Sequence, residues 1–179
     1  MGIRQSYLRR LLLFAGLGWT ARVRAQPAIA PSLMDFAAHT LARLVETARR
    51  QAIAAGVRPM PASVYRGLLG FFPDALLRHV RFASGWRGTL SLPAFAFTYG
   101  DAAAVTVGEV ILFRDERAAQ RDLALWAHEL THVMQYQRWG IDGFASRYVR
   151  DSDGVESEAI SNAGRFTRWL PSARARGTR

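Results

Sequence analysis

The chain has 179 residues, half of them hydrophobic, with 24 Arg, no Lys, 14 acidic residues, four His and no Cys. This composition suits one domain with a hydrophobic core, and it excludes intrinsic disorder, a collagen-like fibre, a disulfide scaffold and zinc–thiolate chemistry. The formal charge of +10 raises the question of nucleic-acid binding. We expect no nucleic-acid partner, because no known binding module is recognisable and the Arg are scattered along the chain.

The first 25 residues are typical of a secretory signal peptide. Three Arg precede an apolar segment at residues 11–19, and Val23 and Ala25 put small residues at the two positions that signal peptidase inspects. Nine apolar residues are too few to cross a bilayer, which takes about 20 residues in a helix. We therefore expect cleavage after Ala25, no stable membrane span, and a periplasmic or secreted protein. The sequence leaves open whether export follows the general or the twin-arginine route.

A long amphipathic helix is predicted next. Apolar side chains recur at helical spacing from Met34 to Ala48. Ser32 followed by Asp35 resembles a capping box, and Gly56 is a natural stop. These signals predict one helix that ends before Gly56.

Two shorter helical segments and a sheet follow. The pattern predicts a helix over residues 62–69, after a turn rich in Pro, and a helical turn over residues 74–78. Between residues 79 and 113 the sequence pattern changes to alternating β-forming residues, with turns expected at residues 100–101 and at Gly108. This part of the chain is predicted to form a small antiparallel sheet.

The C-terminal part is predicted to be helical again. Asp115 is a plausible N-cap for a long helix over residues 117–139, which ends at Gly140. After a short segment and a polar turn at residues 151–154, a last helix is expected over residues 155–170. Pro171 closes that helix, and residues 172–179 are predicted to form a disordered basic tail.

The predicted long helix contains the motif His-Glu-Leu-Thr-His at residues 128–132. Histidines four positions apart lie one above the other on a helix, so His128 and His132 can bind one ion from the same side, at about 2.0–2.1 Å for Zn²⁺. Glu129 points about 100° away around the helix and can reach a water on the open side of the ion. This is the arrangement of a metallopeptidase whose Glu acts as general base. The alternative is two surface histidines beside an acid.

A catalytic zinc site needs a third protein ligand. No His follows His132, and the upstream His39 and His79 are more commonly surface or core residues. Glu156 and Glu158 on the last helix are better candidates, and because they are two positions apart, at most one of them points at the metal. Three loop aspartates remain as rivals: Asp142, Asp151 and Asp153.

Several segments resemble one known family. These are AHELTHVMQY at residues 127–136, WG at 139–140, FA at 144–145, Tyr148, VESEA at 155–159 and TVGEVILF at 106–113. They resemble the core-domain family of zinc metallopeptidases associated with contractile injection systems, over about residues 76–163. The resemblance implies a zincin-like fold, in which a strand before the active-site helix lines the cleft and a later helix supplies a Glu ligand.

The resemblance also implies which Glu binds the metal. In such families the ligand Glu precedes an Ala by three residues, which selects Glu156, with Ala159, over Glu158. An acid or Asn often follows the ligand Glu by one helical turn and supports a ligand His. Ile160 occupies that position here, so this support is not expected from the last helix. The implied ligand set for Zn²⁺ is His128, His132 and Glu156.

The expected reaction is hydrolysis of a peptide bond by a zinc-bound water that Glu129 deprotonates. Tyr148 or Arg147, between the two zinc-binding helices, is a candidate for stabilising the oxyanion. The alternative for these two is a core aromatic residue and a solvated Arg. Tyr136 and Trp139 likewise either line a pocket or belong to the core.

Together these patterns predict an α+β, zincin-like domain over residues 26–171, after a signal peptide at residues 1–25. Its order is N-terminal helices, a small antiparallel sheet, the helix with the histidine motif, and a C-terminal helix with the third ligand. We expect an exported zinc metallopeptidase that acts on a peptide or protein substrate. The alternative is a non-catalytic zinc-binding scaffold that interacts with a secretion or injection apparatus or a toxin. Glu129 separates the two, because a structural site has no use for a base beside its ligands.

Overall fold

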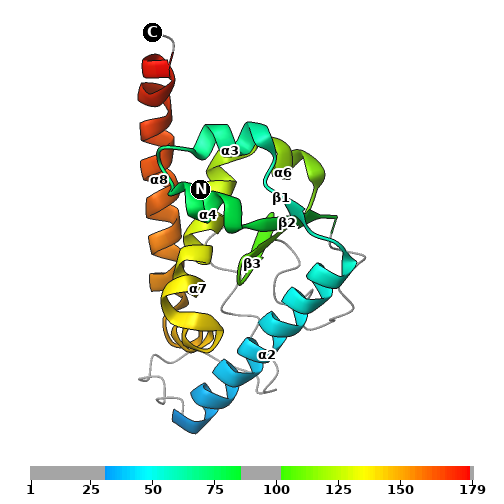
Figure 1. Cartoon of the computed structure of the whole chain (residues 1–179). Coiled ribbons are helices and arrows are strands. Elements are labelled where there is room, and N and C mark those ends of the chain that lie inside the picture. The colour runs from blue at the N-terminus through cyan, green and yellow to red at the C-terminus, as the bar shows by residue number, and fades with distance from the viewer. Residues whose placement is uncertain (1–30, 86–101, 178–179) are drawn as a thin grey trace, which may run out of the picture.

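The computed structural model describes residues 31–85 and 102–177 of the chain. They form a mostly helical, mixed α+β fold with one small sheet (Figure 1). The helices are α2 (Pro31–Ala55), α3 (Ala62–Leu68), α4 (Asp74–His79), α6 (Glu116–Arg121), α7 (Leu123–Arg150) and α8 (Ser152–Gly177), and the strands are β1 (Arg58–Pro59), β2 (Arg81–Ser84), β3 (Ala104–Val107) and β4 (Val110–Phe113). The predicted signal peptide, the predicted turn at residues 100–101 and any strand between residues 90 and 97 lie outside the described residues.

The four strands form a mixed sheet in the order β1-β2-β4-β3. The β1–β2 and β3–β4 pairs are antiparallel, but β2 runs parallel to β4, with Phe82 opposite Ile111. The prediction of a purely antiparallel sheet is therefore wrong at its centre. Alternating β-formers reveal strands but not the direction of their partners, and β2 and β4 are far enough apart in the chain for a parallel pairing. Strand β1 was missed because Pro59 was interpreted as part of a turn; Pro is tolerated in an edge strand such as this one.

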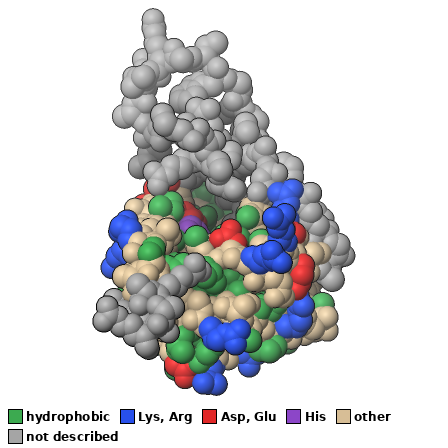
Figure 2. Space-filling view, turned by 90° about the horizontal axis from the view of Figure 1, so that it is seen from above, with side chains coloured by type: hydrophobic (Ala, Val, Ile, Leu, Met, Phe, Trp, Pro, Cys, Tyr) green, Lys and Arg blue, Asp and Glu red, His purple; other side chains and the backbone are tan. Residues whose placement is uncertain are grey.

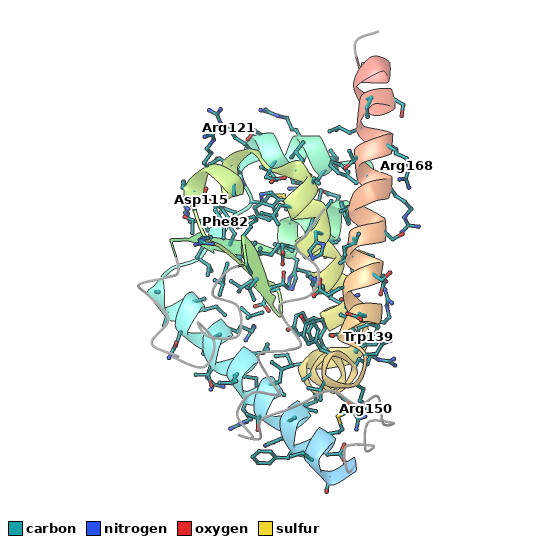
Figure 3. All side chains as sticks on the ribbon, turned by 180° about the vertical axis from the view of Figure 1, so that it is seen from behind. Phe82, Asp115, Arg121, Trp139, Arg150 and Arg168 are labelled. Carbon is teal, nitrogen blue, oxygen red and sulfur yellow. The ribbon has the colours of Figure 1, made fainter. Side chains whose placement is uncertain are left out.

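Strand β4 is buried on both faces, so helices cover the sheet from both sides. On one face Ile111 and Phe113 pack with Phe82 and with Trp126 of α7. Figure 3 marks the position of Phe82 at the sheet. On the other face the alternate residues of β4 pack against Val45 of α2 and its neighbours. The sheet thus fixes the start of α7 from one side, while α2 closes the opposite side.

The hairpin between β3 and β4 anchors α2 to the sheet. Gly108 has a φ of 70°, a left-handed conformation that Gly adopts without strain, and it confirms the turn predicted there. Beside it, the Arg49 guanidinium donates two hydrogen bonds to the Glu109 carboxylate, at 2.7 and 2.5 Å. Burial opposes ionisation of Glu109, but the Arg49 contacts outweigh it and lower the pKa of that carboxyl group.

The long helix predicted over residues 117–139 is two helices in the structure. Asp115 caps α6 as predicted, its carboxylate accepting from the Ala118 amide at 2.8 Å. The chain then leaves helical geometry at Asp122, whose side chain accepts from the Leu125 amide at 2.9 Å and caps α7. The break was missed because the apolar periodicity continues across it, whereas a second capping residue was present in the sequence.

Helix α7 changes direction at Gly140, where φ is 69° and ψ is 176°. The predicted end of the helix at this residue is confirmed as a break in helical geometry. The chain resumes helical structure at once, and residues 144–150 belong to this second part of α7. The change of direction brings the second part back toward α8, as the two helices in Figure 1 show.

Helix α8 begins at Ser152, within the predicted polar turn, and the Asp151 carboxylate accepts from the Gly154 amide at 2.9 Å. It contains Pro171 and continues to Gly177. The predicted helix end at Pro171 is therefore wrong, and residues 172–177 are helical rather than part of a disordered tail. Just before the Pro, Trp169 packs on the core, which supports the helix there. None of the helices in the described ranges combines the length and the apolar character needed to cross a membrane.

Candidate metal centre

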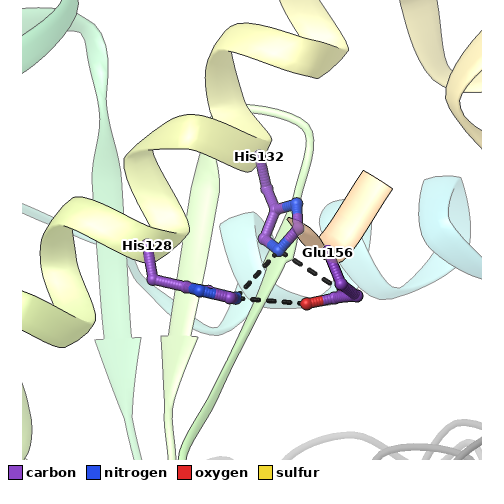
Figure 4. Close-up of side chains that lie close together, drawn as sticks. All are labelled: His128, His132 and Glu156. Carbon is purple, nitrogen blue, oxygen red and sulfur yellow. Dashed lines mark hydrogen bonds and ion pairs between the residues drawn. The ribbon is translucent and has the colours of Figure 1, made fainter. Parts of the chain in front are cut away.

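Helix α7 holds the two motif histidines in a fixed position. Trp126, Leu130 and Val133 are completely buried in the core below the sheet, and they fix the rotation of the helix. This rotation places His128 and His132 on the same side, with their Nε2 atoms 3.1 Å apart (Figure 4). The spacing of four residues produces this pair, as the sequence predicted.

Helix α8 brings Glu156 to the histidines. Val155 and Ala159 are buried against α7, which turns Glu156 toward the same point. One carboxylate oxygen lies 3.3 Å from Nε2 of His128, and the other lies 3.6 Å from Nε2 of His132. The structure thus brings together the three residues that the family resemblance implied as ligands.

The three side chains fit a divalent cation. A tetrahedral ion with bonds of about 2.0–2.1 Å holds its ligand atoms about 3.3–3.4 Å from one another. The two Nε2 atoms are 3.1 Å apart, and each has its own Glu156 oxygen at a similar distance, 3.3 Å for His128 and 3.6 Å for His132. One ligand atom from each of the three side chains lies within 4.8 Å of the other two. Two imidazoles and a carboxylate are also ligands that zinc and neighbouring transition metals accept.

The cluster is accessible from one side. His132 is buried, but the side chains of His128 and Glu156 keep 22% and 34% of their surface exposed. In Figure 2 a histidine side chain is visible in a recess, beside acidic and hydrophobic side chains. In the same view the arginines are scattered in separate groups, as expected from the sequence. An ion held by the three side chains would therefore keep a position open on the exposed side of His128 and Glu156.

The charges within the cluster favour a cation. Burial opposes ionisation of Glu156, but hydrogen bonds with His128 and His132 outweigh it and hold the pKa of the carboxyl group well below its usual range. Burial also opposes protonation of His132, but Glu156 and the nearby charge of Glu129 outweigh it and raise the pKa of the imidazole. In the absence of a metal, a proton is the cation that this cluster attracts.

The rival ligands lie elsewhere. Glu158 points away from the histidines and accepts hydrogen bonds from Gln135 and from Arg138, both at 2.9 Å. Asp151 is occupied with capping α8. Among the described residues, the group that can hold a metal consists of His128, His132 and Glu156, and it excludes four exposed candidates. Those four are His39, His79, Asp142 and Asp153.

Glu129 lies beside the cluster without belonging to it. Its side chain is buried, with 4% of its surface exposed, and its carboxylate accepts a hydrogen bond of 2.7 Å from the hydroxyl group of Thr106 on β3. The same hydroxyl group lies 3.2 Å from the main-chain oxygen of Glu129. Sequence analysis missed Thr106, although a polar residue between Val105 and Val107 was a signal that one face of this strand meets a polar group.

Tyr148 contacts the cluster, whereas Arg147 does not. The Tyr148 hydroxyl group donates to a carboxylate oxygen of Glu156 at 3.2 Å, and its ring stacks on Phe144. Arg147 instead lies over the ring of Trp139, with its guanidinium carbon 4.6 Å from the ring centre. Tyr148 therefore contacts a candidate ligand, and the oxyanion contact expected from the sequence stays a prediction.

The other predicted aromatics form part of the core. Tyr136 is buried and stacks on Phe144, with ring centres 4.0 Å apart, and Trp139 is partly buried against the same cluster. The Phe144 ring also packs edge-to-face with the His132 imidazole, with 6.0 Å between the ring centres. Among the described residues, these aromatics belong to the hydrophobic cluster that packs beside His132.

Gln135 is a second contact that sequence analysis missed. Its side chain is completely buried, and its Oε1 atom lies 2.8 Å from Nδ1 of His132. Its Nε2 atom donates to the main-chain oxygen of Val155 at 3.0 Å and to Glu158 at 2.9 Å. A polar residue three positions after His132, within an apolar stretch, was the available signal. Ile160, where the sequence analysis looked for such support, is exposed.

Part of the chain that contains the histidine motif matches a known family. Residues 59–140 match the family model of the eCIS core domain. The match covers the sheet from Pro59 onward and both histidines but ends before Tyr148 and Glu156. An eCIS core domain suggests a protein associated with secretion or injection, and it does not by itself indicate peptidase activity. Searches of curated proteins and of solved structures found no match.

Proposed function

We propose that this protein is a zinc-dependent peptidase. The observation that carries the proposal is the convergence of His128, His132 and Glu156 on one point, with the buried carboxylate of Glu129 next to them. Zinc bound there would polarise the carbonyl group of a peptide and lower the pKa of a water toward about 7. The donor set and its open side favour zinc in a catalytic rather than a closed structural site.

In this proposal Glu129 is the general base. Its carboxylate takes a proton from the attacking water as the bond from oxygen to the peptide carbon forms, and it returns the proton to the amine as the bond from carbon to nitrogen breaks. Thr106 donates to one carboxylate oxygen and so orients the group.

Tyr148 orients the third ligand. Its hydroxyl group donates to Glu156, and the stacked ring of Phe144 holds the tyrosine in place. A ligand carboxylate fixed by a hydrogen bond keeps its oxygen directed at the ion and binds it more tightly. Both residues lie on the part of α7 that follows Gly140, so the change of direction there contributes to the site.

We further propose that the protein acts outside the cytoplasm, on peptides or proteins, in association with an injection system. Support for export comes from the first 25 residues, which are typical of a signal peptide. Support for the association comes from the match to the eCIS core domain. The competing proposal, a scaffold that holds zinc without catalysis, shares the ligands and differs in the role of Glu129.

The first experiment is elemental analysis of residues 26–179, purified without chelators. We expect one zinc per chain in the wild type and in the control Asp153→Ala, and none in His128→Ala, His132→Ala or Glu156→Ala. Two His and a carboxylate also bind iron in some enzymes. Iron in place of zinc, or a wild type without metal, would overturn the proposal.

The second experiment separates peptidase from scaffold. The zinc-loaded protein is incubated with a mixture of random peptides, and cleavage is followed by mass spectrometry. We expect cleavage by the wild type and by the surface control Glu46→Gln, and at least a 100-fold slower rate for Glu129→Gln with its zinc content unchanged. A zinc-loaded wild type that cleaves nothing, or a Glu129→Gln variant with full activity, would favour the scaffold.

A further inference from the structure

We propose that Gln135 is a positioning residue that selects the metal-binding form of His132: its amide oxygen accepts a hydrogen bond from Nδ1–H and so leaves Nε2 free for the ion. The inference rests on the proposed metal site and concerns how that site is prepared.

The orientation of the Gln135 amide is determined by its partners. The NH₂ group has two protons to donate, and two acceptors lie near it: the main-chain oxygen of Val155 and the carboxylate of Glu158. Neither partner can donate, so the nitrogen of the amide must face them. The amide oxygen then faces His132. Arg138, which donates to Glu158 at 2.9 Å, holds that carboxylate in place from the surface side.

The orientation of the amide determines the proton on the imidazole. The amide oxygen of Gln135 only accepts, and it lies 2.8 Å from Nδ1 of His132, so Nδ1 must carry a proton. A neutral imidazole with its proton on Nδ1 has its lone pair on Nε2. That lone pair points at the space between His128 and Glu156, where the ion is expected.

The burial of both side chains makes this arrangement rigid. Gln135 is completely buried and His132 is 6% exposed, so neither group can exchange its partner for bulk water. Phe144 packs against the imidazole ring with its plane almost perpendicular, at 87°. The other tautomer would place two acceptors against each other in the core, an arrangement that buried groups avoid. The interaction therefore favours the metal-binding form before any ion arrives.

The test uses Gln135→Met, which keeps the size of the side chain and removes the acceptor. Gln137→Met is the matched control, because Gln137 is exposed on the same helix. Zinc affinity is measured by competition with a chromophoric chelator. We expect about 10- to 100-fold weaker binding for Gln135→Met and no change for Gln137→Met. Equal affinity in both variants would overturn the inference.

A second readout does not depend on metal. In the metal-free protein, at a pH that leaves the imidazole neutral, ¹⁵N NMR reports which nitrogen of His132 carries the proton. We expect the Nδ1–H form in the wild type and a mixture in Gln135→Met. An Nε2–H form in the wild type would overturn the inference. If the wild type shows the Nδ1–H form but binds no zinc, the proposed function fails and the role of Gln135 in selecting the tautomer stands.

A third variant covers the case in which Gln135→Met does not fold. Glu158→Gln leaves the core intact and removes the charge that accepts from the Gln135 amide. We expect zinc binding weakened about threefold, because the amide is less firmly oriented while its oxygen still reaches His132. Unchanged affinity in Glu158→Gln, measured by the same competition with a chelator, would count against the inference.

Discussion

Two carboxylates, Glu116 and Glu156, are each held by side chains from other parts of the fold, but they differ in what holds them. Glu116, at the start of α6, accepts hydrogen bonds from Arg58 at 2.6 Å, from Gln120 at 2.7 Å and from Ser84. These contacts, led by that of Arg58, lower the pKa of Glu116 to about 2. Each of these partners donates a hydrogen bond, and the positive charge of Arg58 balances the carboxylate.

Glu156 has partners of another kind. His128 and His132 turn their Nε2 atoms toward it, and Nδ1–H of His132 donates to Gln135, so no fixed positive charge balances the carboxylate. The cluster therefore has acceptors in excess and attracts a cation, either a proton or a metal ion. A set of polar groups that satisfies itself, such as that of Glu116, stabilises the fold, whereas one that is satisfied only by an added ion indicates a binding site.

Replacing each carboxylate by its amide tests this difference most directly. We expect Glu156→Gln to weaken zinc binding by at least 100-fold, because one charged ligand is lost, and Glu116→Gln to leave it unchanged. A competition titration with a chelator measures both. Similar affinities for the two variants would show that Glu156 is not a ligand.

Removing the metal should sharpen the contrast in stability. Zinc at 100 times its Kd stabilises the folded state by about 2.7 kcal/mol, so addition of a chelator is expected to lower Tm by about 5–10 °C. Glu116→Gln should show the same decrease. Glu156→Gln should show none, and a decrease of full size in that variant, measured by calorimetry, would contradict the assignment.

The pH dependence should differ in sign between the metal-free and zinc-loaded forms. The pKa of His132 is raised above 6.5 in the fold, so the metal-free protein has this stabilisation below pH 6.5 and loses it as the pH rises through the raised value. Zinc competes with that proton, so its affinity increases over the same range. Urea unfolding with and without zinc, at a series of pH values, measures both slopes. The same pH dependence of the unfolding free energy with and without zinc would contradict the assumption that zinc and the proton compete for His132.

The smallest effect is expected at Glu116 itself. Because its pKa is lowered from 4.5 to about 2, its contacts stabilise the fold above pH 4.5, and this contribution is lost as the pH falls toward 2. The side chains are about half exposed, so Glu116→Gln should reduce the free energy of unfolding by less than about 1 kcal/mol. Urea unfolding at neutral pH and at pH 2–3 checks this. A difference that persists at low pH would assign the effect to packing.

The parts of the molecule that sequence could predict are those set by local spacing. His128 and His132 are four residues apart on one helix, and the rotation of that helix follows from Trp126, Leu130 and Val133, so the pair could be placed without a structure. The amphipathic α2 and the cap at Asp115 are likewise local. The mixed α+β class also follows from such patterns.

The missed features depend on contacts between distant segments. The parallel pairing of β2 with β4, the hydrogen bond from Thr106 to Glu129 and the contact of Gln135 with Glu158 join residues that no local pattern relates. Glu156 was selected over Glu158 by resemblance, because spacing alone showed only that the two point in different directions. The break at Asp122 is a different case, since the capping signal was present and a continuous apolar stripe concealed it.

The arrangement of α7 and α8 has a consequence for how the chain folds. All three candidate ligands lie within the 29 residues from His128 to Glu156, on two helices that follow each other in the chain. An ion bound there closes a loop of about that length. In the chain-entropy model of cross-links, such a loop reduces the conformational entropy of the unfolded state and so stabilises the fold by about 3–4 kcal/mol. In a protein without cysteine, the metal would thus act as a reversible cross-link, and its release would loosen the helical hairpin first.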